Sequence, residues 1–198
     1  MHNKNNNSVN FALFMAFHYF CKKQIMQQKG YIRVYTGNGQ GKTTAAFGVA
    51  LRAACAGKKV YIAQFVKDMK YNETKVAKFM PNITIEQLGK GCFLDREPDE
   101  ADKVMALRAL AKCNEIMKRG LYDLVVLDEL TIALHVGLLT TAEVLKALSQ
   151  RDGHTEIIIT GRYAPQELID LADLVTEMQE IKHYYATSGV VSRDGFDH

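Results

Sequence analysis

The sequence lacks several patterns that would mark particular classes of protein. No C-x-x-C pair is present, because the four cysteines lie far apart as Cys21, Cys55, Cys92 and Cys113. Neither a zinc site nor a thiol redox motif is therefore indicated, and free thiols in a reducing compartment are the simpler interpretation. The formal net charge is only +3, which is too small to indicate a nucleic-acid or membrane partner. Also absent is any Ser/His/Asp arrangement typical of a nucleophile with its base. In an enzyme, we expect a bound substrate to supply the nucleophile.

A membrane-spanning run is not expected either. The apolar, aromatic stretch at residues 9–20 follows an Asn-rich start and has only 12 residues, whereas a bilayer needs about 20. No clean signal-peptide cleavage site follows this stretch. The sequence therefore predicts a cytoplasmic protein, in which residues 1–29 form an N-terminal extension that acts as an arm. The alternative for this extension is an artefact of an upstream start codon.

The rest of the chain, residues 30–198, has the length of a single domain. Strand-like patterns recur at residues 31–35, 59–66, 83–88, 121–127, 155–160 and 174–178. Helical patterns lie between them at residues 45–56, 98–119, 141–150 and 165–171. Apolar strands that alternate with helices indicate a parallel sheet covered on both faces, so the predicted fold class is α/β.

A glycine-rich segment, Thr36-Gly37-Asn38-Gly39-Gln40-Gly41-Lys42-Thr43-Thr44, joins the first predicted strand to the first helix. Such a turn aims unpaired backbone N–H groups and a helix dipole at one point, and a polyphosphate is its natural occupant. Lys42 would supply a charge to the phosphates and Thr43 a hydroxyl to Mg²⁺. The usual G-x-x-x-x-G-K-[ST] spacing has glycine where this chain has Thr36, so the loop is altered.

Charged side chains follow two of the predicted strands. Asp128 and Glu129 end one apolar run, and ligands of open α/β sheets bind at the carboxyl ends of strands. The two carboxylates suit Mg²⁺; capping of the next helix, or activation of water by Glu129, are the alternatives. Arg162 follows another buried strand and Arg52 lies on the first helix, so both could stabilise a phosphate chain. For Arg52, a surface salt bridge is equally expected.

One further loop, residues 89–94, combines two glycines with apolar side chains after the third strand. It could cover a flat hydrophobic ligand or be a plain surface turn. His183, beside Lys182, is the one histidine in a suggestive place.

These motifs, taken in order, resemble those of the P-loop-type ATP:corrinoid adenosyltransferases. The glycine-rich segment through Ala46 is similar to the phosphate loop of that family, and Leu127-Asp128-Glu129-Leu130 to its acidic segment. The family order continues through Ala133-Leu134-His135, Gly137-Leu138-Leu139, Thr160-Gly161-Arg162, Ala164-Pro165, residues 171–178 and Lys182-His183. The resemblance covers residue 30 to the C-terminus.

The resemblance implies a P-loop NTPase-like fold of the RecA type and a specific reaction. The 5′-deoxyadenosyl group of ATP passes to a Co(I) corrinoid, such as cobalamin or cobyrinic acid a,c-diamide, and triphosphate leaves. Co(I) needs no deprotonation, which agrees with the missing protein nucleophile. The resemblance also implies Mg²⁺, a homodimer, an electron donor such as a flavoprotein reductase, and ATP bound in reverse. The rival hypotheses are a P-loop ATPase or kinase, and a nucleotide-gated corrinoid-binding module.

Carried over residue by residue, the resemblance also implies roles. Contacts with ATP are expected from Gly37, Asn38, Gly39, Gln40, Gly41, Lys42, Thr43, Thr44, Arg52 and Arg162. The expected catalytic residues are Lys42, Glu129 and Arg162, and the expected Mg²⁺ ligands are Thr43 and Glu129. Corrinoid contacts are expected from Gly91, Cys92, Phe93 and Leu94, although the family's phenylalanine and tryptophan are replaced here by Cys92 and Leu94. Residues 1–29 gain a role as an active-site lid.

Overall fold

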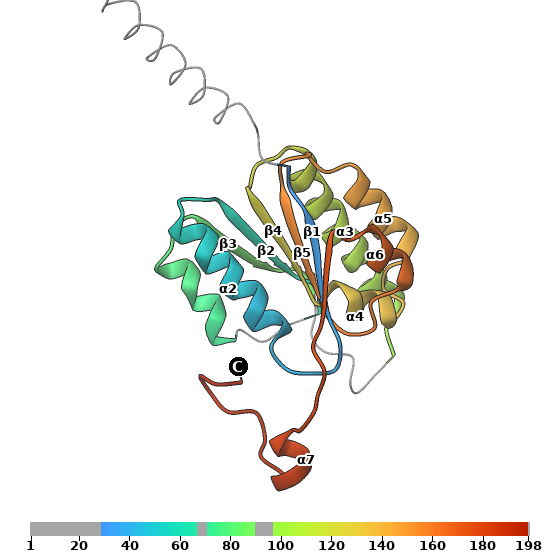
Figure 1. Cartoon of the computed structure of the whole chain (residues 1–198). Helices are drawn as coiled ribbons and strands as arrows, with labels where there is room; N and C mark the ends of the chain where they lie inside the picture. Colours follow the sequence, from blue (N-terminus) through green and yellow to red (C-terminus); the bar gives the residue numbers. More distant parts are fainter. Residues whose placement is uncertain (1–28, 67–70, 90–96, 198) are drawn as a thin grey trace, which may run out of the picture.

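The computed structural model of the chain describes residues 29–66, 71–89 and 97–197. Within these residues, six parallel strands form one sheet in the order β3-β2-β4-β5-β1-β6 (Figure 1). The strands are β1 (Ile32–Thr36), β2 (Val60–Gln64), β3 (Ile83–Gln87), β4 (Leu124–Asp128), β5 (Glu156–Thr160) and β6 (Leu174–Glu177). The predicted α/β fold with a parallel sheet is confirmed.

Helices cover both faces of this sheet (Figure 1). One face carries α2 (Lys42–Cys55) and the 3₁₀ helix η1 (Asn72–Lys78). The other carries α3 (Glu100–Lys118), α4 (Leu130–His135), α5 (Thr141–Ser149) and α6 (Gln166–Leu171). A last short helix, α7 (Tyr184–Ser188), lies beyond the carboxyl end of the sheet. None of the helices in the described ranges is both long and apolar enough to cross a membrane.

The sheet divides the hydrophobic core into two clusters. Val125 and Leu127 of β4 pack in the cluster that includes α3 and α5, whereas Leu124 and Val126 pack in the cluster that includes α2. Because successive side chains of a strand point to opposite faces, a strand buried on both faces must be apolar throughout. This is why the strands are near-continuous apolar runs in the sequence.

Helix α2 packs on the sheet through its smallest side chains. Ala46, Ala50 and Ala54 follow each other at intervals of four residues and are almost completely buried. Residues four apart lie on one face of a helix, so these three alanines form a stripe along the face in contact with the sheet. No large side chain separates the helix backbone from β4 and β5 along this stripe.

Capping groups fix where the other long helices begin. Asp99 caps α3, accepting a hydrogen bond from the N–H of Asp102 while the Asp102 carboxylate accepts from the N–H of Asp99. The helix therefore starts at Glu100, two residues after the predicted start at residue 98. Thr140 and Glu143 form the same capping box at the start of α5.

Three helices of the structure were not predicted from the sequence. They are η1, α4 and α7, and each has seven residues or fewer. The predicted extension, residues 1–29, falls outside the described residues except for Lys29. Its role as an arm or lid therefore stays a prediction.

Candidate active site

The glycine-rich segment forms the loop between β1 and α2, and its glycines are required there. Gly37 and Gly41 have φ angles of 96° and 110°, in the left-handed region that favours glycine. The N–H of Gly39 donates a 2.7 Å hydrogen bond to the carbonyl of Met178, just after β6. A Cβ atom on Gly37 would lie 2.4 Å from that same carbonyl oxygen, so larger residues would push the loop away from β6.

Thr36 stands where the usual loop has its first glycine. It is the last residue of β1, and its Oγ1 accepts a 3.4 Å hydrogen bond from the N–H of Ala164. Ala164 follows Arg162 by two residues, so this contact links the start of the loop to the segment that carries the arginine.

Lys42 is folded back into the loop. Its Nζ donates 2.7 Å hydrogen bonds to the carbonyls of Gly37 and Gly39, and the residue is only 6% exposed. Burial lowers the pKa of Lys42; the charge of Arg162 lowers the pKa further, and the carboxylate of Glu129 partly opposes this. The three residues predicted to be catalytic therefore lie within electrostatic reach of one another.

A buried carboxylate holds the second residue of the motif in place. Asp128 is fully buried at the end of β4, and its Oδ1 accepts hydrogen bonds from Thr43 Oγ1 (2.9 Å) and Thr160 Oγ1 (2.7 Å). Its Oδ2 accepts a 3.0 Å bond from Nε2 of Gln64. Gln64 and Thr160 end β2 and β5, the strands on either side of β4. Residues at the ends of three neighbouring strands therefore hold the carboxylate that binds the Thr43 hydroxyl.

Gln64 and Thr160 were not among the predicted site residues. Both are fully buried polar residues that end an apolar strand, and that pattern could have drawn attention to them. A buried polar side chain must find a hydrogen-bond partner, and the carboxyl ends of parallel strands share one edge of the sheet.

The turn after β4 and the turn after β5 both contain unusual backbone conformations. Glu129 has a φ angle of 60°, and its N–H donates a 3.0 Å hydrogen bond to Thr160 Oγ1. Tyr163, the neighbour of Arg162, has a φ angle of 58°. Non-glycine residues in this region cost on the order of 1–3 kcal/mol and cluster at functional sites. The two turns thus present Glu129 and Arg162 at the same edge of the sheet.

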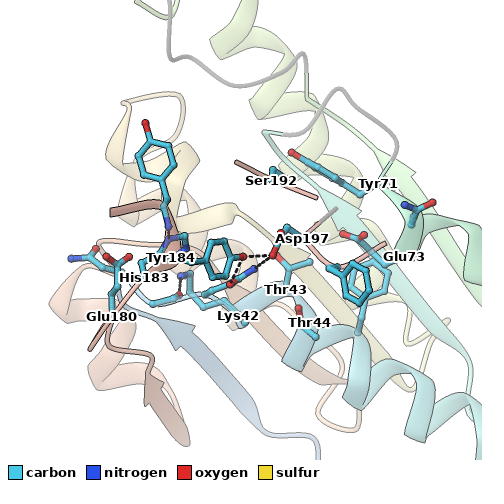
Figure 2. A pocket seen from close by; sticks show the side chains of 18 of the residues that line it. Lys42, Thr43, Thr44, Tyr71, Glu73, Glu180, His183, Tyr184, Ser192 and Asp197 are labelled. Atoms are coloured by element: carbon cyan, nitrogen blue, oxygen red, sulfur yellow. Dashed lines mark hydrogen bonds between the residues drawn. The ribbon is translucent and has the colours of Figure 1, made fainter. Parts of the chain in front are cut away.

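A cavity of about 670 Å³ opens above this edge (Figure 2). Nine of the predicted site residues line it: Asn38, Gly39, Gln40, Gly41, Lys42, Thr43, Thr44, Glu129 and Arg162. Gly37 does not line the cavity but accepts the hydrogen bond from Lys42. Arg52 is exposed on α2 and does not line the cavity either. The residues predicted to bind a corrinoid, Gly91 to Leu94, lie outside the described residues.

The far wall of the cavity comes from a part of the chain in which the sequence drew attention only to His183. It is formed by side chains after β6, including Glu180, His183, Tyr184, Ser192, Phe196 and Asp197. Apolar rings from Phe47 of α2 and from Tyr71 complete the lining. The cavity therefore has a polar, cationic end at the loop, and aromatic rings lie among polar and acidic side chains around the remainder.

The oxygen donors at the loop fit Mg²⁺. The described residues contain no group of three or more His, Cys, Asp or Glu side chains that could hold a metal alone. Mg²⁺ bound beside a nucleotide does not need such a group, because phosphates and water supply most of its ligands and the protein adds one or two oxygens. The Thr43 hydroxyl and the Glu129 carboxylate are donors of that kind at the cavity wall.

Comparisons with known proteins point to one family. The family described as "ATP:corrinoid adenosyltransferase BtuR/CobO/CobP" matches residues 28–198. The corrinoid adenosyltransferase CobA of Salmonella typhimurium is 37% identical over 175 residues, which cover 88% of this chain and 89% of that protein. The corrinoid adenosyltransferase of Sinorhizobium sp is 34% identical over 194 residues, covering 94% and 90%. That of Escherichia coli K12 is 34% identical over 175 residues, covering 88% and 89%.

Proposed function

Because the chain belongs to the ATP:corrinoid adenosyltransferase family, and is therefore a transferase, we propose how its cavity performs adenosyl transfer. ATP binds with its triphosphate on the glycine-rich loop, and the 5′-deoxyadenosyl group passes to a Co(I) corrinoid. The cobalt attacks the 5′-carbon, a cobalt–carbon bond forms, and the carbon–oxygen bond to the triphosphate breaks. The electron pair of the broken bond leaves with the triphosphate.

One observation carries this proposal: Lys42 and Arg162 converge at the loop end of a cavity large enough for a nucleotide. Negative charge grows on the leaving triphosphate during the reaction, and fixed cations beside it stabilise that charge. Burial, and then the charge of Arg162, lower the pKa of Lys42, while Glu129 partly opposes this. A bound polyphosphate would stabilise the charged form of the lysine.

The remaining residues of the loop position the phosphates. Backbone N–H groups of Asn38, Gln40 and Gly41 and the start of α2 suit an anion, whereas the N–H of Gly39 is bonded to Met178. Thr43 and Glu129 would hold Mg²⁺ against the phosphates, with Asp128 orienting the Thr43 hydroxyl. Arg52 is exposed ten residues beyond Lys42 on α2, about 15 Å along the helix, so we assign it no contact with phosphates held at the loop.

Holding the reacting atoms in line is the second task of the site. An attack on the 5′-carbon requires cobalt and the leaving oxygen on opposite sides of that carbon. With the triphosphate at the loop, the adenosyl group extends into the aromatic part of the cavity. We propose that residues 91–94 hold the corrinoid over this end and that residues 1–29 cover it as a lid. We further propose a cytoplasmic homodimer that receives Co(I) corrinoid from a separate electron donor.

Product analysis tests the proposed function. ATP, Mg²⁺ and corrinoid are incubated with a chemical reductant that produces Co(I), and the phosphorus products are separated by anion exchange. We expect intact triphosphate, in one-to-one ratio with adenosylated corrinoid, and only when Co(I) is present. ADP and phosphate as products would favour an ATPase or kinase instead. Corrinoid binding that depends on ATP but gives no product would favour a binding module.

A further inference from the structure

The C-terminal segment, residues 189–197, is fastened to the phosphate loop through one carboxylate. Asp197 Oδ1 accepts a 2.9 Å hydrogen bond from Nε2 of Gln40 and a second bond from the Tyr184 hydroxyl. Asp197 Oδ2 accepts bonds from the backbone N–H (3.0 Å) and Nε (2.9 Å) of Arg193. The Asp197 side chain is only 8% exposed. A single side chain thus connects α7, the C-terminal segment and the loop (Figure 2).

Arg193 reinforces this connection. Its guanidinium lies over the rings of Tyr184 and Phe196, at 4.8 Å and 5.4 Å from their centroids. Hydrogen bonds from Arg193, Tyr184 and Gln40, in that order, hold the pKa of Asp197 well below its usual range. The carboxylate is therefore charged at every physiological pH, and Arg193 balances its charge locally.

The segment forms a wall of the cavity and does not fill it. Phe196 and Asp197 line the cavity where the segment meets Gln40 of the loop, and a volume of about 670 Å³ remains in the cavity. Pockets for small ligands typically have volumes of about 300–1,000 Å³. Lys42 is hydrogen-bonded to loop carbonyls, and Asp197 is paired with Arg193. The charge of the Asp197 carboxylate is therefore balanced by Arg193 and not by Lys42, the lysine expected to bind the phosphates.

We propose that Asp197 is a positioning residue for ATP, which fixes residues 189–197 as the outer wall of the nucleotide site. The proposal rests on the ATP site described above and adds a part of the chain to it. The wall limits the movement of bound ATP and keeps water from the phosphates, so it contributes to ATP affinity. In this proposal the wall acts on ATP alone, so corrinoid affinity is expected to be independent of it.

Asp197→Asn tests the proposal, because it removes the charge and keeps the shape. Asp170→Asn, which makes the same change on exposed α6, is the matched control. We expect Asp197→Asn to weaken binding of radiolabelled MgATP about tenfold in equilibrium dialysis and to raise the KM for ATP equally. The kcat and the KM for corrinoid should stay within twofold of the wild-type values. Asp197→Glu, which keeps the charge, should recover part of the affinity.

Other outcomes overturn the proposal in distinguishable ways. Unchanged MgATP affinity in Asp197→Asn would mean that the segment is not part of the site. Tighter binding would mean that the segment blocks ATP. Should Asp197→Asn unfold, Tyr184→Phe, which removes only the hydroxyl and its bonds to Asp197 and Gln40, gives a second measurement in the same direction. If the wild type binds ATP but releases ADP, the proposed function fails while the effect of the wall on affinity is still measured.

Discussion

Thr160→Val gives a sharp test of the hydrogen bonds around the buried Asp128. Valine has the shape of threonine without the hydroxyl, so the packing of β5 is kept. The change removes the 2.7 Å hydrogen bond to Asp128 Oδ1 and the acceptor for the Glu129 N–H. It leaves a fully buried carboxylate with one donor fewer, and it frees the turn that presents Glu129.

The magnitude follows from the two bonds lost. A hydrogen bond to a charged group contributes about 1.5–3 kcal/mol and a neutral one about 0.5–1.5 kcal/mol. We therefore expect the free energy of unfolding to fall by about 2–4 kcal/mol. For a domain of this length, that lowers the melting temperature by roughly 4–16 °C. Because the Thr43 hydroxyl shares Asp128 Oδ1, the KM for ATP should rise as well.

Urea unfolding followed by circular dichroism measures the effect, with Thr155→Val as the control. Thr155 is also buried beside β5, but its hydroxyl donates to a neutral carbonyl, that of Tyr122, at 3.3 Å. The control should lose only about 0.5–1.5 kcal/mol and keep its KM for ATP. The two variants could instead lose the same free energy of unfolding, with an unchanged slope of that free energy against urea concentration. This result would refute the assignment of a charged group with three hydrogen-bond donors to Asp128.

Three further predictions concern the loop, the corrinoid and the response to acid. Lys42→Ala should lower kcat/KM by at least about 100-fold. Near-normal turnover by this variant would contradict the role assigned to Lys42. Leu94→Ala should weaken corrinoid binding or slow turnover in spectroscopic assays, and normal values would exclude its loop as a cover. Asp173 accepts the N–H of Ile32 at 2.9 Å, and this bond, with Lys29, lowers its pKa. Its stabilisation is therefore present above pH 3.9 and lost as the pH falls through the folded-state value. Asp173→Asn should flatten the curve of stability against pH in that range, and an unchanged acid transition would argue against the bond.

The sequence was sufficient for the sheet and for most of the phosphate loop. The four central strands were visible as short apolar runs because they are buried on both faces, and β3 was visible from its alternating pattern, while β6 was recognised although its residues are exposed. Helix α2 begins at Lys42, three residues before the predicted start, because Gly41 adopts the left-handed conformation immediately before it. Helix α4 was missed although α6, which also has six residues, was predicted; Pro165 marks the start of α6, whereas no proline marks the start of α4.

The hydrogen bonds between distant segments could not be predicted in the same way. The sequence showed that Asp128 and Glu129 end a strand, but not that Asp128 would bind Thr43, 85 residues away. The contact between Gln40 and Asp197 joins residues that are 157 positions apart in the sequence. The segment around Asp197 shows neither helical nor strand periodicity. Such pairs are set by how the strands are ordered in the sheet, and strand order is not a local property of the sequence.

The stripe of Ala46, Ala50 and Ala54 determines more than the packing of α2. Lys42 and Thr43 are the first residues of this helix. The distance between the helix axis and the sheet therefore also sets how far these two side chains lie from the ends of the strands. A larger side chain anywhere in the stripe would lift the whole helix, as a rigid rod, and carry the motif with it. Ala54 lies three helical turns from Lys42. We nevertheless expect a larger residue at this position to lower activity as much as a substitution of a residue that contacts ATP.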